Sequence, residues 1–203
     1  REKKIIEFLE GFASDHNLEC QRNNTRNILI REPASPGMEN IKPVVLQSHM
    51  DMVGEKDSDT VHDWDKDPIT PVIEGDWVKA VKTTLGADDG IGIAAQMLIL
   101  TDSDIKTGPV ECLFTVDEES GMTGAKNIQP GFFNSRILIN LDSEDEGELF
   151  IGCSGGIDTI ATMTFSGEKP VAGADALKVS LTGLSGGHSG DEIHRGFGNS
   201  VKI

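Results

Sequence analysis

Histidine and acidic residues occur at four separate points of this 203-residue chain, in contexts that could support metal binding and hydrolysis. His49 and Asp51 are two residues apart, so in an extended backbone their side chains point to the same side. An imidazole that binds a metal ion commonly has a carboxylate partner that orients the ring. The same spacing is also frequent in polar loops, and taken alone it leaves both interpretations open.

Asp88 and Asp89 lie within the glycine-bounded segment 86–90. One interpretation is a helix N-cap, where a carboxylate accepts backbone N–H groups and suits the helix dipole. The alternative is that Asp88 bridges two metal ions, one on each carboxylate oxygen, while Asp89 forms the cap.

Two further acidic points follow apolar runs. Glu118 and Glu119 are adjacent, so one carboxylate could bind a metal ion while its neighbour acts as a base, as metal-assisted hydrolysis requires. Such a pair is also often merely solvated. Asp142 begins an acidic run, 142–148, that lacks the arrangement of an EF-hand calcium loop. We interpret Asp142 as a ligand and the remainder as a solvated turn.

Short apolar runs precede these points and predict the strands that position them. A near-continuous apolar run, typical of a strand buried on both faces of a sheet, occurs in each of residues 43–48, 110–116 and 136–141. Residues 91–100 suggest a buried helix. Because ligands gather at the carboxyl ends of strands in open α/β sheets, the four points are expected to share one crevice.

Patterns elsewhere complete the predicted architecture. Apolar residues at helical spacing predict an amphipathic helix near residues 1–15, and a strand is expected over 27–31. After residue 156 the pattern changes to alternating segments, 158–165 and 176–181, which predict half-exposed strands. The fold class is therefore α/β, with a mixed, largely parallel sheet flanked by helices over residues 1–156. A second domain is expected over 157–203.

The composition excludes some functions. Eighteen Lys and Arg residues against 34 Asp and Glu give a net charge of −16, which disfavours binding to nucleic acid or to anionic membranes. No stretch reaches the roughly 18–20 apolar residues of a membrane span. The three cysteines are odd in number and lack CxxC spacing, which favours a reducing compartment and a cytoplasmic location.

Taken in order, five motifs resemble those of the di-zinc exopeptidases and deacylases, which include aminoacylases and carboxypeptidases. The motifs occupy residues 47–52, 85–92, 117–122, 140–143 and 186–190. Within that superfamily the chain most resembles the aminoacyl-histidine dipeptidases, also called Xaa-His dipeptidases or peptidase D. Residues 60–64, 155–158 and 192–194 look like that subgroup in particular, and the likeness covers nearly the whole chain.

The resemblance implies hydrolysis of dipeptides, mainly Xaa-His, by a hydroxide that bridges two zinc ions; cobalt or manganese are alternative metals. His49 and Asp142 would bind one zinc ion and Glu119 the other, with Asp88 as the bridge. The partner would be a small peptide, and a homodimer is possible.

Three further residues receive catalytic roles from the resemblance. Glu118 would be the general acid and base, and Asp51 would orient the metal-binding His49. His188 resembles a histidine of the lid domain that stabilises the oxyanion. The segment 157–203 would then be the beginning of an α+β lid domain.

Several alternatives remain at this stage. The family's members are much longer and carry a last histidine ligand near their C-terminus, so we expect this chain to be an N-terminal fragment with little activity alone. Enzymatic alternatives are a tripeptidase, a carboxypeptidase or an N-acyl-amino-acid deacylase. A non-enzymatic alternative is an acidic calcium-binding or interaction module, whose carboxylates would be scattered rather than clustered.

Overall fold

A computed structural model describes residues 2–143, 146–153, 155, 157, 159–186, 192–199 and 202. The chain divides into two compact units, Arg1–Glu146 and Gly147–Ile203, and each is described here by itself. The predicted domain boundary after residue 156 stays a prediction. No helix among the described residues is both long enough and apolar enough to cross a membrane.

The first unit contains nearly all of the regular structure. Its elements in chain order are α1 (Lys3–Asp15), β1 (Glu19–Arg22), β2 (Ile28–Glu32), β3 (Val44–His49), β4 (Pro71–Glu74), β5 (Trp77–Ala80), α2 (Ala87–Thr101), β6 (Val110–Thr115), α3 (Thr123–Lys126) and β7 (Ile137–Asn140). The structure confirms the predicted helices near residues 1–15 and 91–100 and the four predicted strands β2, β3, β6 and β7. The expectation that the run 136–141 is buried on both faces is wrong, because every residue of β7 is exposed at the edge of the sheet. Strands β1, β4 and β5 and the short α3 were not predicted.

Five strands form one mixed sheet in the order β1-β2-β6-β3-β7. Strand β3 is parallel to both β6 and β7, whereas β2 is antiparallel to β1 and β6. The α/β fold class is therefore confirmed. Since β3, β6 and β7 run in the same direction, their carboxyl ends lie at one edge of the sheet.

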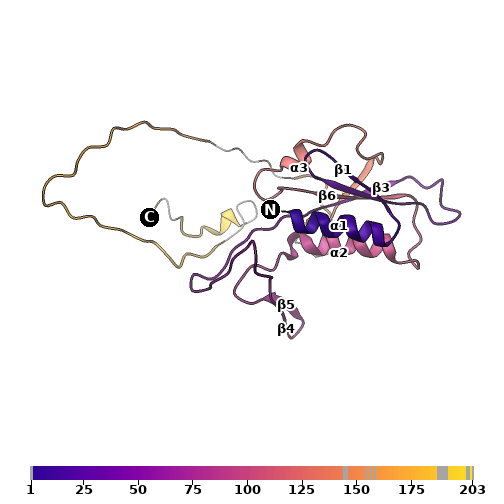
Figure 1. Ribbon diagram of the computed structural model, residues 1–203, viewed down its shortest axis with the longest axis horizontal. Coiled ribbons are helices and arrows are strands. Elements are labelled where there is room, and N and C mark those ends of the chain that lie inside the picture. The colour runs from indigo at the N-terminus through magenta and orange to yellow at the C-terminus, as the bar shows by residue number, and fades with distance from the viewer. Residues whose placement is uncertain are drawn as a thin grey trace. The chain divides into compact units, whose positions relative to one another are not determined.

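Alternating side chains of the sheet build two apolar layers. On one face, α1 and α2 cover the sheet, and the core includes buried residues of both helices and of β2, β3 and β6 (Figure 1). On the other face, Leu29, Val45 and Leu113 pack against Phe132, which follows α3 in the chain. This alternation explains why β6 is buried along its entire length.

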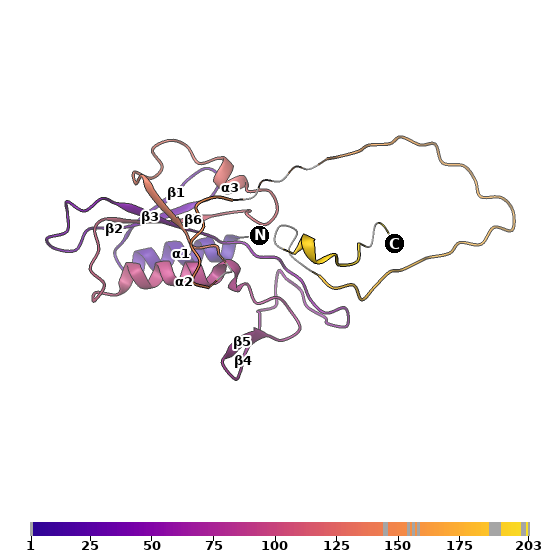
Figure 2. The ribbon, with the colours of Figure 1, turned by 180° about the vertical axis from the view of Figure 1, so that it is seen from behind.

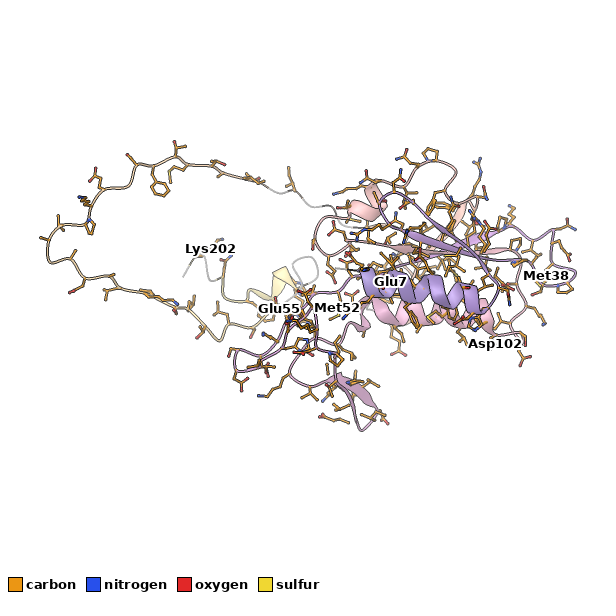
Figure 3. All side chains as sticks on the ribbon, viewed as in Figure 1. Glu7, Met38, Met52, Glu55, Asp102 and Lys202 are labelled. Carbon is orange, nitrogen blue, oxygen red and sulfur yellow. The ribbon has the colours of Figure 1, made fainter. Side chains whose placement is uncertain are left out.

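A long excursion, residues 50–86, leaves the sheet after β3 and returns at α2. It contains the β4–β5 hairpin, whose two strands pair only with each other (Figure 2). The ends of the excursion meet where Met52, labelled in Figure 3, lies against Gly86. Gly86 has a φ of +77°, and a Cβ there would lie 2.7 Å from the Met52 sulfur, so this junction requires glycine.

The second unit contains a single short 3₁₀ helix, η1 (Ile193–Arg195), among its described residues. The predicted strands over 158–165 and 176–181 are wrong for the residues that the structure describes. Most apolar side chains in these segments are almost fully exposed; Ile160, Phe165 and Val179 keep 90%, 90% and 92% of their accessible surface. An alternating pattern becomes a strand only when a neighbouring strand and an apolar layer are available, and these segments have neither.

Candidate metal-binding active site

The predicted site residues converge at the carboxyl edge of the parallel strands. His49 ends β3, Asp88 lies at the start of α2, and Glu118 and Glu119 belong to the turn after β6. One ligand atom from each of His49, Asp88 and Glu119 lies within 4.8 Å of the others. The same holds for the ligand atoms of the second set, which consists of His49, Glu118 and Asp142, the last of these placed just beyond β7.

His49 stands between the acidic residues of the site. Its side chain is only 1% exposed, and Nε2 lies 2.9 Å from Asp88 Oδ1 and 3.9 Å from Asp142 Oδ2. The Nδ1 atom is 2.8 Å from the Asp51 backbone carbonyl, so a proton on Nδ1 leaves Nε2 to face the carboxylates. Burial opposes protonation of His49, but the hydrogen bond to Asp88 and the charge of Asp142 outweigh it and raise its pKa.

Asp51 connects the end of β3 to the turn after β6. Its carboxylate accepts the backbone N–H of Glu118 at 2.9 Å and that of Glu119 at 3.1 Å. The distance from this carboxylate to His49 Nδ1 is 3.5 Å, so the backbone carbonyl of Asp51 makes the shorter contact with the ring. One residue thereby fixes both the imidazole and the glutamate pair.

Asp89 lies in the first turn of α2, whose N-cap residue is Gly86, and its carboxylate binds backbone N–H groups of two elements. Its side chain accepts the Gly92 N–H and also the backbone N–H of His49, each at 3.2 Å. The residue is 2% exposed, and this burial, together with the charge of Asp142, raises the pKa of Asp89 to about 6. A buried carboxylate thus joins α2 to β3 directly beside Asp88.

The two glutamates of the turn are held in an environment that favours their protonated forms. Burial raises the pKa of Glu118, and the charges of Asp142 and Asp51 act in the same direction while His49 opposes them. Burial also raises the pKa of Glu119, followed in effect by the charge of Asp88. Clustered carboxylates with raised pKa values are typical of functional sites.

The donor set fits a divalent metal ion. An imidazole nitrogen and several carboxylate oxygens within one small volume are the ligands that zinc, manganese and cobalt accept. Bringing so much negative charge together is unfavourable without a cation, and this repulsion adds to burial in raising the pKa values of Glu118 and Glu119. A cavity of about 360 Å³ opens beside Asp88 and Asp142 and is also lined by the apolar Ile91.

Sequence reasoning singled out one residue that the structure does not describe and missed another that it does. His188 lies outside the described residues, so its predicted role stays a prediction. Gln96 was not predicted to matter, yet it is fully buried in the interface between α2 and β3. A single amide within the otherwise apolar run 91–100 was the signal that could have drawn attention to it.

The chain is similar to known proteins in sequence and in fold. A model of the family described as peptidase family M20/M25/M40 matches residues 45–179. The chain is 50% identical over 202 residues to the cytosol non-specific dipeptidase of Escherichia coli strain K12, matching all of this chain and 42% of that protein. The chain therefore spans less than half the length of this relative.

Two solved structures are similar to the chain. The aminoacylhistidine dipeptidase from Vibrio alginolyticus matches with a TM-score of 0.69 and 49% identity, over 71% of this chain and 29% of that one. The aminopeptidase PepT from Bacillus cereus ATCC 10987 matches with a TM-score of 0.59 and 26% identity, over 71% of this chain and 39% of that one.

Proposed function

The chain belongs to peptidase family M20/M25/M40, and on this premise we propose that the protein containing it is a metal-dependent dipeptidase that prefers substrates with a C-terminal histidine. The observation that carries the proposal is the convergence of His49, Asp88, Glu119 and Asp142 at the carboxyl edge of the sheet. The names of the dipeptidases from E. coli and V. alginolyticus support the substrate class.

The proposed metal site takes two zinc ions. His49 and Asp142 would hold one ion, Glu119 would hold the other, and Asp88 would bridge them. When bound, such ions polarise the peptide carbonyl and make a water molecule more acidic. The position of the His49 ring, whose Nε2 faces both Asp88 and Asp142, supports the first of these assignments.

The remaining roles fall to residues around the metal site. Glu118 would take the proton of the attacking water and later give it to the leaving amine, and its raised pKa supports this assignment. Asp51 would hold the His49 ring and the Glu118 backbone in fixed positions relative to each other, and its hydrogen bonds support that role. His188 would stabilise the oxyanion, an assignment that rests on the family resemblance alone.

The experiment that tests this function uses the full-length protein. We expect hydrolysis of dipeptides with C-terminal histidine, loss of activity on treatment with a chelator, and recovery on adding zinc. We expect His49→Ala to lower both zinc content and turnover. Activity that survives complete removal of the metal would contradict the proposal. Cobalt and manganese, added in place of zinc, identify the metal that gives the highest turnover.

The same assay separates the proposed activity from its nearest alternative. The similarity to the aminopeptidase PepT from B. cereus favours comparing substrates of different length, so dipeptides, tripeptides and acylated amino acids are tested together. Faster turnover of tripeptides would contradict the dipeptidase assignment. We also propose a cytoplasmic location, supported by the E. coli relative's name, and a homodimer, supported by the resemblance and testable by sedimentation.

A further inference from the structure

Gln96 forms a polar contact in the middle of the apolar interface between α2 and β3. Its side chain is fully buried, as is that of Ser48. With the amide oriented so that every polar atom has a partner, Gln96 Nε2 donates to the Leu46 carbonyl at 3.3 Å. Its Oε1 accepts the Ser48 hydroxyl at 2.5 Å and the Ser48 N–H at 3.2 Å.

These bonds hold the end of β3 at a particular position along α2. Two of the three involve backbone groups of β3, so they fix the strand itself rather than one side chain. The next residue along, His49, is tied to the same helix because its backbone N–H donates to Asp89. Consecutive backbone N–H groups of β3 are therefore bound by two buried side chains of α2.

Asp88 lies beside Asp89 at the start of α2, where the backbone angles of both residues depart from the helical values. The distance of 2.9 Å between His49 Nε2 and Asp88 Oδ1 consequently depends on how β3 and α2 are aligned. Apolar packing alone tolerates small sliding movements, whereas a buried amide with three partners permits only one alignment, because sliding would leave its polar groups unsatisfied.

We propose that Gln96 is a positioning residue of the metal site, acting through Ser48 to set the spacing between His49 and Asp88. The inference rests on the proposed function, since it assigns Gln96 a part in building that metal centre. Residues that orient metal ligands without touching the metal typically change metal affinity by about 10- to 100-fold when mutated. We expect a similar effect here, although Gln96 contacts no ligand side chain.

The test measures zinc affinity in the full-length protein by competition with a chromophoric chelator. Gln96→Met keeps a side chain of similar length and apolar stem but removes the amide. In this variant, we expect the dissociation constant of the more tightly bound zinc ion to rise by about 10-fold or more. We also expect a shift of the visible absorption bands when cobalt replaces zinc, because these bands report ligand geometry.

Two further variants separate positioning from general destabilisation. Leu100→Ala opens a cavity in the same helix, where Leu100 is buried in the apolar core, and should lower the melting temperature while zinc affinity stays the same. The double variant Ser48→Ala/Gln96→Met removes the unsatisfied hydroxyl. This double variant should regain part of the lost stability but keep the weakened zinc affinity, because the hydrogen bonds of the Gln96 amide to the backbone of β3 are not restored.

The possible outcomes are distinct. Wild-type zinc affinity and an unchanged cobalt spectrum in Gln96→Met would overturn the inference and leave the proposed function intact. Loss of affinity in Leu100→Ala, in proportion to its lower melting temperature, would also overturn it, because Gln96 would then be only structural. Unchanged zinc affinity in His49→Ala would instead overturn the proposed metal site, and the inference with it.

Discussion

Glu118 and Glu119 lie side by side in one turn, but their environments differ. The Asp51 carboxylate accepts hydrogen bonds from the backbone N–H groups of both residues, and these bonds fix the turn relative to the end of β3. The ligand atom of Glu118 lies within 4.8 Å of those of His49 and Asp142, whereas that of Glu119 lies within 4.8 Å of those of His49 and Asp88. This arrangement suits a division in which one carboxylate binds metal and the other transfers a proton.

The first prediction concerns the proton transfer. In the full-length protein, Glu118→Gln should lower kcat by about 10²- to 10⁴-fold, because an amide cannot accept the proton of water. Zinc content should stay near that of the wild type, since the proposed ligands are unchanged. Steady-state kinetics and metal analysis on the same preparation measure both quantities.

A matched substitution controls for the change from carboxylate to amide. Glu7 is exposed on α1 and pairs with Lys3 at the surface, so Glu7→Gln should leave kcat and zinc content unchanged. Turnover near the wild-type rate in Glu118→Gln would remove this residue from the mechanism.

At the scale of elements, Glu111 connects β6 to the segment before β7. Its buried carboxylate accepts the backbone N–H groups of Asn134 and Ser135, the Ser135 hydroxyl, and Arg31 Nε at 3.1 Å. Burial alone would raise the pKa of Glu111, but these hydrogen bonds outweigh it and lower the pKa. The bonds hold the chain that leads into β7 and hence to Asp142.

The second prediction follows from this lowered pKa. Glu111→Gln should lower the free energy of unfolding at pH 7 by about 2–3 kcal/mol, because charge-assisted hydrogen bonds are lost. A carboxyl group with a lowered pKa stabilises the fold above its ordinary pKa of 4.5, and this contribution disappears as the pH falls through the lowered value. The difference between variant and wild type should therefore shrink below about pH 4.5.

Urea unfolding monitored by circular dichroism at several pH values measures the difference in free energy of unfolding between Glu111→Gln and the wild type. Glu32 provides the control, because it lies in the same sheet and burial raises rather than lowers its pKa. Glu32→Gln should not destabilise the fold at pH 7. A constant difference between Glu111→Gln and the wild type at all pH values would contradict the assigned electrostatic origin.

The third prediction compares two glycines in helices. A Cβ on Gly124, in α3, would lie 2.4 Å from Asn27 Oδ1 and 2.5 Å from the Val116 carbonyl, so Gly124→Ala should destabilise the fold by about 1–3 kcal/mol. A Cβ on Gly11, in α1, would meet nothing within 4 Å. Gly11→Ala should therefore stabilise the fold by about 0.5–1 kcal/mol, and urea midpoints measure both effects. Equal effects of the two substitutions would contradict this account.

These elements also show which parts of the fold the sequence could predict. The amphipathic α1 and the apolar runs of β3 and β6 were predictable because burial of apolar residues determines them. The apolar run of β7 was also recognised, although its residues are exposed at the edge of the sheet. Strand β1 could not be predicted, since all of its residues are exposed and only pairing with β2 makes it a strand.

The site was predictable to a similar extent. The positions of His49 and Asp142 followed from the rule that ligands gather at strand ends, whereas the role of Asp88, at the start of α2, came from the family resemblance. The contacts of Asp51 with the Glu118 turn, and those of Gln96 with β3, could not be predicted. They join side chains to backbone groups far away in the sequence, so they depend on how the elements pack.

At the scale of the whole molecule, the fourth prediction concerns residues 1–203 studied alone. If His49, Asp88 and Asp142 hold one zinc ion, the other has only Glu119 and Asp88 as ligands in the part of the chain that the structure describes. A catalytic zinc ion usually has three protein ligands, so zinc titration by calorimetry should show one tight site and at most one weak site. Dipeptide turnover should be far below that of the full-length protein.

The His49→Ala variant of the same chain supplies the control, since it should lose the tight site. Two equally tight zinc ions in residues 1–203 would show that another residue completes the second site.

The strand order has a further consequence for the growing polypeptide on the ribosome. Among the described residues, strand β3 pairs with β6 and β7 alone, and the hydrogen bond from Gln47 to Thr115 joins residues 68 positions apart. At about 5–20 residues per second, roughly 3–14 s pass between synthesis of these two residues. During that interval β1 and β2 can already pair and α2 can pack on β3, but β3 has no strand partner. The backbone edges of the strand that carries His49 thus stay unpaired until β6 has emerged, and unpaired edges favour aggregation.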